Sequence, residues 1–132
     1  MHKFDFKNRT AVVTGGAQGF GLDVAKRFLD SGAKVFIWDI DEKLIKSVVD
    51  EIKNPNLDYN IVDVANYKDV EKNVSQITSK TNIDILINNA GITGPTGPLW
   101  EYDVEIWNKI VQINLMGTFN CCRAIVPNMI KH

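Results

Sequence analysis

The sequence has few of the residues that build metal sites and nucleophilic triads. It contains two histidines, His2 and His132, one near each end of the chain, and two adjacent cysteines, Cys121 and Cys122. A Ser-His-Asp triad or a histidine-based metal centre has almost nothing to draw on here, and adjacent cysteines rarely bridge each other. We therefore expect no metal ion, and we expect free thiols of the kind found in the reducing cytoplasm.

Long apolar runs and an excess of one charge are also absent. No stretch approaches the roughly 18 apolar residues of a membrane-spanning helix, and the N-terminus does not resemble a signal peptide. Lys and Arg total 15 and Asp and Glu total 16, which gives a net charge of −1. This balance argues against a nucleic-acid surface, so we expect neither a membrane nor a nucleic-acid partner. The 132 residues, 45% of them hydrophobic, suffice for a single domain over residues 1–132.

Short apolar runs alternate with segments of helical periodicity along the whole chain. Alternation of this kind is typical of βαβ units, which form a parallel sheet with helices on both faces. We therefore predict an α/β fold, a doubly wound three-layer α/β/α arrangement whose strands are apolar throughout. The expected strands are residues 10–14, 34–38, 57–62 and 83–87, and the last helix is expected to run unbroken over 103–129, with Pro127 bending its final turns.

A glycine-rich turn follows the first expected strand, with Gly15, Gly19 and Gly21 in it. Glycine lets a phosphate approach backbone N–H groups, and the following helix points its positive N-terminal end at the anion. A tight turn that only packs helix on strand is the alternative interpretation. A P-loop is rejected, because that motif continues with Lys and Ser or Thr, whereas this chain has Leu22-Asp23.

Asp39 ends the second expected strand, about 20 residues beyond the glycine turn, where dinucleotide-binding folds place a carboxylate on the adenosine ribose. A carboxylate there repels a 2′-phosphate, and neither Gln18 nor Ile40 supplies the cation that NADP favours. The pattern predicts NAD, with NADP disfavoured. The alternative is a helix cap, a role that Asp41 could fill equally well.

Asn114 interrupts an apolar stretch of the last expected helix. A buried amide without hydrogen-bond partners is costly, so this side chain must bond backbone or water, or face a polar site. A surface-facing asparagine on an amphipathic helix is the alternative.

These segments resemble the short-chain dehydrogenase/reductase family. Residues 14–21, TGGAQGFG, are similar to its TGxxxGxG cofactor turn, and residues 88–91 match its NNAG motif. Asn114 stands where the family carries a catalytic asparagine, and Asp63-Val64 resembles the pair that holds adenine. The resemblance covers residues from about 10 to 129, nearly the whole chain.

The resemblance implies a Rossmann-like sheet with strand order 3-2-1-4 and a hydride transfer between NAD and a small secondary alcohol or ketone. It implies Asn114 as a catalytic residue. The cofactor-binding residues it implies are Gly15, Gln18, Gly19, Phe20, Gly21, Asp39, Ile40, Asp63, Val64, Asn89, Ala90 and Gly91.

One part of the family's pattern is missing from the sequence. The family pairs a catalytic Tyr with a Lys four residues later, but Tyr59, Tyr67 and Tyr102 are followed at that distance by Asp, Glu and Ile. We therefore expect the cofactor-binding half of the family's fold, without its C-terminal half and inactive alone. A non-catalytic NAD-binding module, or a remnant that associates with another chain, is the alternative.

The same resemblance bears on surfaces and substrates. The expected strand 83–87 would form a long apolar edge of the sheet, and helix 103–129 would pair with its copy in a homo-oligomer, a dimer or tetramer. The segment 91–99 is similar both to members acting on sugar-derived acids and to members reducing 3-oxoacyl thioesters. The segment therefore does not distinguish between these two classes of substrate.

Overall fold

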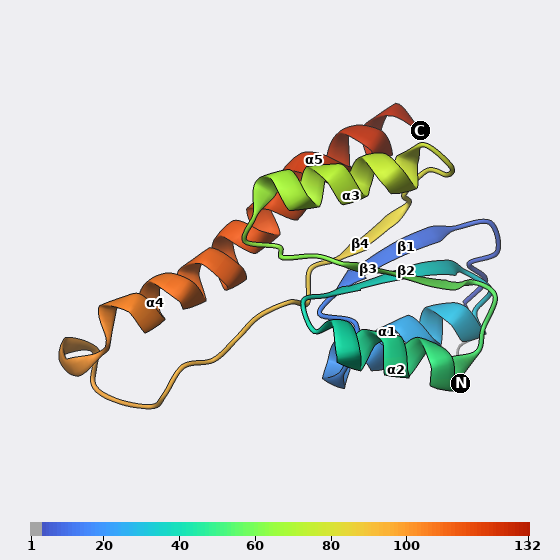
Figure 1. Ribbon diagram of the computed structural model, residues 1–132. Helices are drawn as coiled ribbons and strands as arrows, with labels where there is room; N and C mark the ends of the chain where they lie inside the picture. Colours follow the sequence, from blue (N-terminus) through green and yellow to red (C-terminus); the bar gives the residue numbers. More distant parts are fainter. Residues whose placement is uncertain (1–3) are drawn as a thin grey trace.

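The computed structural model describes residues 4–132 and shows a parallel sheet between two helical layers (Figure 1). The sheet has four strands in the order β3-β2-β1-β4, as the family resemblance implied. The elements are β1 (Thr10–Thr14), α1 (Gly19–Asp30), β2 (Lys34–Asp39), α2 (Glu42–Ile52), β3 (Leu57–Ile61), α3 (Tyr67–Thr78), β4 (Ile85–Ile87), the 3₁₀ turn η1 (Leu99–Glu101), α4 (Val104–Val111), the π-helical turn η2 (Gln112–Met116) and α5 (Gly117–Lys131).

The two central strands are apolar because both of their faces are covered. Helices α1 and α2 lie on one face of the sheet, and α3 and α5 lie on the other (Figure 1). Every residue of β1 is buried. The prediction that all strands are apolar is wrong for β3, where Asp58 is exposed and Asn60 is half-buried. β3 is an edge strand, so its outward positions meet solvent rather than a second helix layer.

Parallel pairing brings the carboxyl ends of the strands to one edge of the sheet. Thr14 at the end of β1 pairs with Trp38 in β2, and Val13 pairs with Ile87 at the end of β4. On the far side, Asp39 pairs with Ile61 of β3. The segments that follow these strands therefore converge on the same edge, which is where open α/β sheets bind ligands.

The edge strand β4 is shorter than expected. The prediction was a long strand over residues 83–87, but the ladder with β1 covers only Ile85–Ile87. Ile83 is buried and donates its N–H to Asn128 Oδ1 on α5 at 2.9 Å. The next N–H, that of Asp84, still donates to Thr10 O of β1 at 2.9 Å. Because a side chain of α5 takes the Ile83 donor, the apolar edge available to another strand is short.

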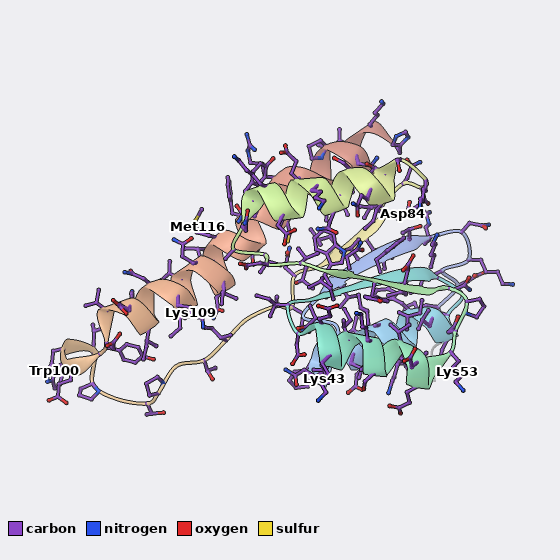
Figure 2. All side chains as sticks on the ribbon, viewed as in Figure 1. Lys43, Lys53, Asp84, Trp100, Lys109 and Met116 are labelled. Atoms are coloured by element: carbon purple, nitrogen blue, oxygen red, sulfur yellow. The ribbon has the colours of Figure 1, made fainter. Side chains whose placement is uncertain are left out.

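The predicted unbroken helix over residues 103–129 is wrong in one respect. The helical path is interrupted by the π-helical turn Gln112–Met116, which separates α4 from α5, and α5 continues past Pro127 to Lys131. α4 stands away from the sheet, with Trp100 at its far end and Met116 where it joins the body (Figure 2). No residue of α4 is buried. None of the helices over residues 4–132 is long and apolar enough to span a bilayer.

Candidate cofactor site

A cavity of about 350 Å³ opens at the carboxyl edge of the sheet. It is built by the segments that follow β1, β2, β3 and β4, with one side chain from η2. The lining residues are Gly15, Gln18, Gly19, Phe20, Trp38, Asp39, Ile40, Val62, Val64, Asn89, Ala90, Gly91, Ile92 and Ile113. Ten of the twelve predicted cofactor-binding residues therefore meet in one place.

The glycine turn gives the cavity a floor of bare backbone. Gly15 and Gly19 have φ values of +62° and +56°, a region that favours glycine. A Cβ added at Gly19 would meet no atom within 4 Å, so the space before its backbone is open. Gln18 makes no side-chain cap to α1, and the first turn of α1 holds no acidic residue. The positive end of α1 is therefore left available to an anion in the cavity.

Gly21 contributes packing rather than a cavity wall. A Cβ at this position would overlap the carbonyl oxygen of Gly15 and lie 2.5 Å from Asn89 Nδ2. Gly21 is accordingly buried and lies outside the cavity lining. Its neighbour Phe20 does line the cavity, and its ring is 85% exposed.

Thr14 ties the glycine turn to the segment after β4. Its Oγ1 accepts hydrogen bonds from the backbone N–H groups of Asn89 at 3.1 Å and Ala90 at 3.0 Å, and donates to Ile87 O at 3.4 Å. In return, Asn89 Nδ2 donates to Thr14 O at 3.2 Å and Gly15 O at 3.1 Å. Thr14 was not among the predicted site residues, although a hydroxyl at the end of a buried strand is itself a signal of such a role.

Asp39 supplies the carboxylate of the cavity, and two backbone N–H groups hold that carboxylate in place. Its Oδ2 accepts from Ala17 N, and its Oδ1 accepts from Asp41 N, both at 3.2 Å. The N-cap of α2 is made instead by Asp41, whose Oδ1 accepts from Leu44 N at 2.9 Å. The helix-cap role is therefore filled by Asp41, and the ribose-binding role of Asp39 stays a prediction. Among the lining residues of the described chain Asp39 is the one that carries a charge.

The far end of the cavity is apolar. Trp38, Val62, Val64 and Ile113 face it, and only Val64 was predicted. The tryptophans were interpreted as packing residues; Trp38 is buried in the core and lines the cavity as well, whereas Trp100 is 85% exposed. The hydrophobic periodicity of the sequence predicts that these apolar side chains are in the core. It cannot predict that they also line a cavity.

Val64 lines the cavity, but its neighbour Asp63 does not. Asp63 Oδ1 accepts from Ala65 N at 3.0 Å, so the carboxylate closes its own turn. Val64 O accepts from Asn120 Nδ2 of α5 at 2.9 Å, and a Cβ at Gly117 would press on Val64 at 2.7 Å. Asn120 is therefore a further positioning residue that sequence reasoning missed.

Asn114 anchors the loop after β4 rather than lining the cavity. Its Oδ1 accepts from Ile92 N at 2.8 Å, and its Nδ2 donates to Ile92 O at 2.9 Å. The bond to backbone was one of the roles expected for it. The π-helical turn around Asn114 was not foreseen, and such single turns are frequent at functional sites. A π-helical turn of this length produces no hydrophobic periodicity by which a sequence could predict it.

The two cysteines do not form a nucleophilic centre. Burial raises the pKa of the Cys121 thiol to about 12, which keeps it protonated at neutral pH. Cys122 lies beside β4, where its Sγ accepts from Asn88 Nδ2 at 3.4 Å. Both act as packing residues at the junction of α5 and the sheet.

The family model for short chain dehydrogenases matches residues 9–132. The chain belongs to this family. It is 36% identical over 128 residues to the 2-dehydro-3-deoxy-L-rhamnonate dehydrogenase (NAD(+)) of Sphingomonas sp., covering 96% of this chain and 51% of that protein. It is 34% identical to the 3-oxoacyl-[acyl-carrier-protein] reductase of Chlamydia muridarum, covering 94% and 51%.

Solved structures of short-chain dehydrogenases have the same fold. The 2-keto-3-deoxy-D-gluconate dehydrogenase of Streptococcus agalactiae superposes with a TM-score of 0.83 at 28% identity, covering 98% of this chain and 49% of that one. The chain thus spans about half the length of the curated relatives it matches.

The Thr14 hydroxyl can be tested as a structural tie. Thr14→Val keeps the shape of the side chain but leaves the N–H groups of Asn89 and Ala90 without their acceptor, so we expect a loss of about 2–3 kcal/mol in unfolding free energy. Urea denaturation followed by circular dichroism measures it.

The matched control for this experiment is Thr10→Val at the other end of β1. Thr10 Oγ1 shares a single hydrogen bond with Thr81 Oγ1 at 3.3 Å, so the expected loss is about 1 kcal/mol or less. Equal losses in the two variants would contradict the role given to Thr14.

Proposed function

We propose that this chain binds NAD in the cavity at the carboxyl edge of the sheet. It would serve as the cofactor-binding part of a short-chain oxidoreductase that interconverts a small secondary alcohol and a ketone. One observation carries the proposal: bare backbone at Gly15 and Gly19 and a fixed carboxylate at Asp39 line the same cavity. The NAD(+) named for the Sphingomonas relative supports it.

The residues fit a dinucleotide along the length of the cavity. The open space before Gly19 and the uncapped end of α1 suit a diphosphate, and Asp39 suits the hydroxyls of the adenosine ribose. Ile40 and Val64 would flank the adenine. Asn89, Ala90 and Gly91 would line the path towards the nicotinamide ribose. The bound cofactor supplies a hydride acceptor; the residues of this chain hold and orient it.

Asp39 supports NAD over NADP on electrostatic grounds. Its carboxylate is half-buried and held by two backbone N–H groups, so it cannot swing away from a 2′-phosphate without losing them. Among the described residues, no Lys or Arg lines the cavity to offset it. A second negative charge placed there would be repelled.

Hydride transfer also requires a group that exchanges a proton with the substrate oxygen. No Tyr, Lys, His or Ser lines the described cavity. Asn114 would act as a positioning residue in a complete site, since it holds Ile92 at the mouth of the cavity. The alternative function, a non-catalytic NAD-binding module or a remnant that associates with another chain, is favoured by this same lack of a proton donor.

We propose a second copy of this chain as the partner of the arm formed by α4, η2 and the start of α5. Val104, Trp107, Leu115 and Phe119 are all exposed there. A helix of eight residues with no buried side chain gains little stability by itself, so an apolar partner surface is needed to hold it. A dimer or tetramer in the cytoplasm satisfies this need.

Calorimetry with both cofactors tests the binding proposal. We expect NAD to bind and NADP to bind about tenfold or more weakly, because the 2′-phosphate faces the Asp39 carboxylate. Asp39→Arg should reverse this preference. Asp50→Arg makes the same charge change on the exposed side of α2 and should leave it unaltered. A folded chain that releases no heat at millimolar NAD would refute the proposed function.

A second binding prediction concerns the glycine turn. Gly19→Ala places a Cβ in the open space before the turn and strains a φ of +56°, so NAD affinity should fall about tenfold. Gly97→Ala, a position with equally free surroundings and no positive φ, should leave the affinity unchanged. Isothermal titration calorimetry of both variants measures the Kd for NAD. An unaltered Kd in Gly19→Ala would show that the diphosphate binds elsewhere.

The chain alone is expected to bind NAD without turnover. Absorbance at the NADH band, followed with NAD and a panel of secondary alcohols, should stay at the rate of the buffer blank. Turnover at an ordinary enzymatic rate would show that a proton donor exists which the described cavity does not reveal.

A further inference from the structure

The loop between β4 and α4 has a contact of its own with the arm. It leaves the sheet after Ile87 and reaches η1 at the far end of the arm (Figure 1). Of residues 93–110, all within the described chain, only Gly94, Tyr102 and Ile110 are half-buried, and the others are exposed. These three residues meet, because a Cβ built on Gly94 would overlap the Tyr102 hydroxyl oxygen and lie 2.7 Å from Ile110 Cδ1. This set, the Gly94 cluster, therefore ties this part of the loop to the arm.

Tyr102 reaches Gly94 from a fixed place on the arm. It follows η1 directly, and its N–H donates to Leu99 O at 3.2 Å. Its ring lies edge-on to the ring of Trp107, with 5.6 Å between the ring centroids and 80° between the two planes. The missing Cβ at Gly94 leaves the room that the Tyr102 side chain occupies. The tyrosine is thus oriented by the arm and packs on the loop.

The loop changes its attachment from the sheet to the arm within a few residues. Ala90 donates its N–H to Thr14 Oγ1 of β1 at 3.0 Å, so it is held by the sheet. Two residues later, Ile92 exchanges two hydrogen bonds with the side chain of Asn114 in η2, and the Gly94 cluster follows. Ile92 also lines the cavity. One wall of the cavity mouth is therefore held by the arm, first through Asn114 and then through the Gly94 cluster.

We propose that Tyr102 is a positioning residue for the nicotinamide end of the bound cofactor. By packing on Gly94 it holds the loop to the arm and so fixes Ile92 at the mouth of the cavity. The adenosine and the diphosphate are proposed to bind where β1 and β2 end, and their binding does not depend on Tyr102. This inference rests on the proposed cofactor function, which places the nicotinamide ribose beside residues 89–91, and adds to it a residue that lies outside the cavity.

Calorimetry with NAD and with ADP tests the inference, because ADP has the adenosine and the diphosphate but lacks the nicotinamide riboside. In Gly94→Ala the new methyl group would overlap the Tyr102 hydroxyl, so the loop has to move off the arm. We expect the Kd for NAD to rise about fivefold, since the loop loses its preorganised position, and the Kd for ADP to stay unchanged. Gly97→Ala, in the same loop but with no atom within 4 Å of the new Cβ, should change neither Kd.

Variants of Tyr102 test whether the effect of Gly94→Ala acts through this side chain. Tyr102→Ala removes the ring from Gly94 and should also raise the Kd for NAD about fivefold, with ADP binding unchanged. Tyr102→Phe keeps the ring, whose Cζ atom lies 3.1 Å from the Cβ position of residue 94, and should bind NAD almost as tightly as the unaltered chain. The double variant Gly94→Ala, Tyr102→Ala should bind NAD no more weakly than either single variant, because both changes break the same contact.

The outcomes separate a positioning role from a merely structural one. Equal losses of NAD and ADP affinity in Gly94→Ala would show a general defect of the fold and would overturn the inference. Unchanged NAD binding in Gly94→Ala and Tyr102→Ala, or additive losses in the double variant, would also overturn it while leaving the cofactor function intact. A folded chain that binds neither NAD nor ADP would overturn the cofactor function itself, and this inference with it.

Discussion

The hydroxyl of Thr14 is the contact on which the rest of the site depends. It lies at the end of β1, where it accepts two backbone N–H groups from the segment after β4 and donates to the last carbonyl of that strand. It ties the glycine turn to the Asn89–Gly91 segment. Joined, they form two walls of one cavity whose separation is set by hydrogen bonds rather than by loop stiffness. Asn89 adds two further hydrogen bonds between the segments, because its Nδ2 donates to the carbonyl oxygens of Thr14 and Gly15.

Three asparagines hold residues that line the cavity without lining it themselves, and each does so through its side-chain amide. Asn114 holds Ile92, Asn120 holds the carbonyl of Val64, and Asn60 holds the indole of Trp38. An amide donates and accepts at once, so it can fix a loop in both directions without carrying a charge into the region where a charged ligand must be recognised. Among the described lining residues the cavity has one carboxylate, at Asp39, and the discrimination that we propose between ribose hydroxyls and a 2′-phosphate would follow from that single group.

The parts of the structure that could be predicted from the sequence are those whose cause is local. The buried run of β1, the glycine turn and the carboxylate ending β2 each follow from residue types at short spacing, and they place Gly15, Gly19 and Asp39 correctly on one edge. The errors have causes that are distant in sequence. The ladder of β4 begins only at Ile85, and the N–H of Ile83 is taken by Asn128, 45 residues away. Asp63 turns into its own loop, and Trp38, which was predicted as a packing residue, is at the cavity as well. Neither the π-helical turn at Asn114 nor these contacts leaves a pattern that periodicity can detect.

The described structure contains the groups proposed to bind the cofactor but not the groups needed to transfer a proton. The residues that line the cavity belong to the end of β2, to the segments that follow the four strands and to the first turn of α1, apart from Ile113 in the π-helical turn. A dinucleotide therefore has its proposed contacts without any further polypeptide. Catalysis would also need a proton donor, and no Tyr, Lys, His or Ser lines the cavity among the described residues. The arm leaves apolar side chains exposed, and Leu115, next to Asn114 in the sequence, is one of them. Ile113 lines the cavity from the π-helical turn that joins α4 to α5, so a second copy covering this arm, as we propose, would lie next to the candidate cofactor site.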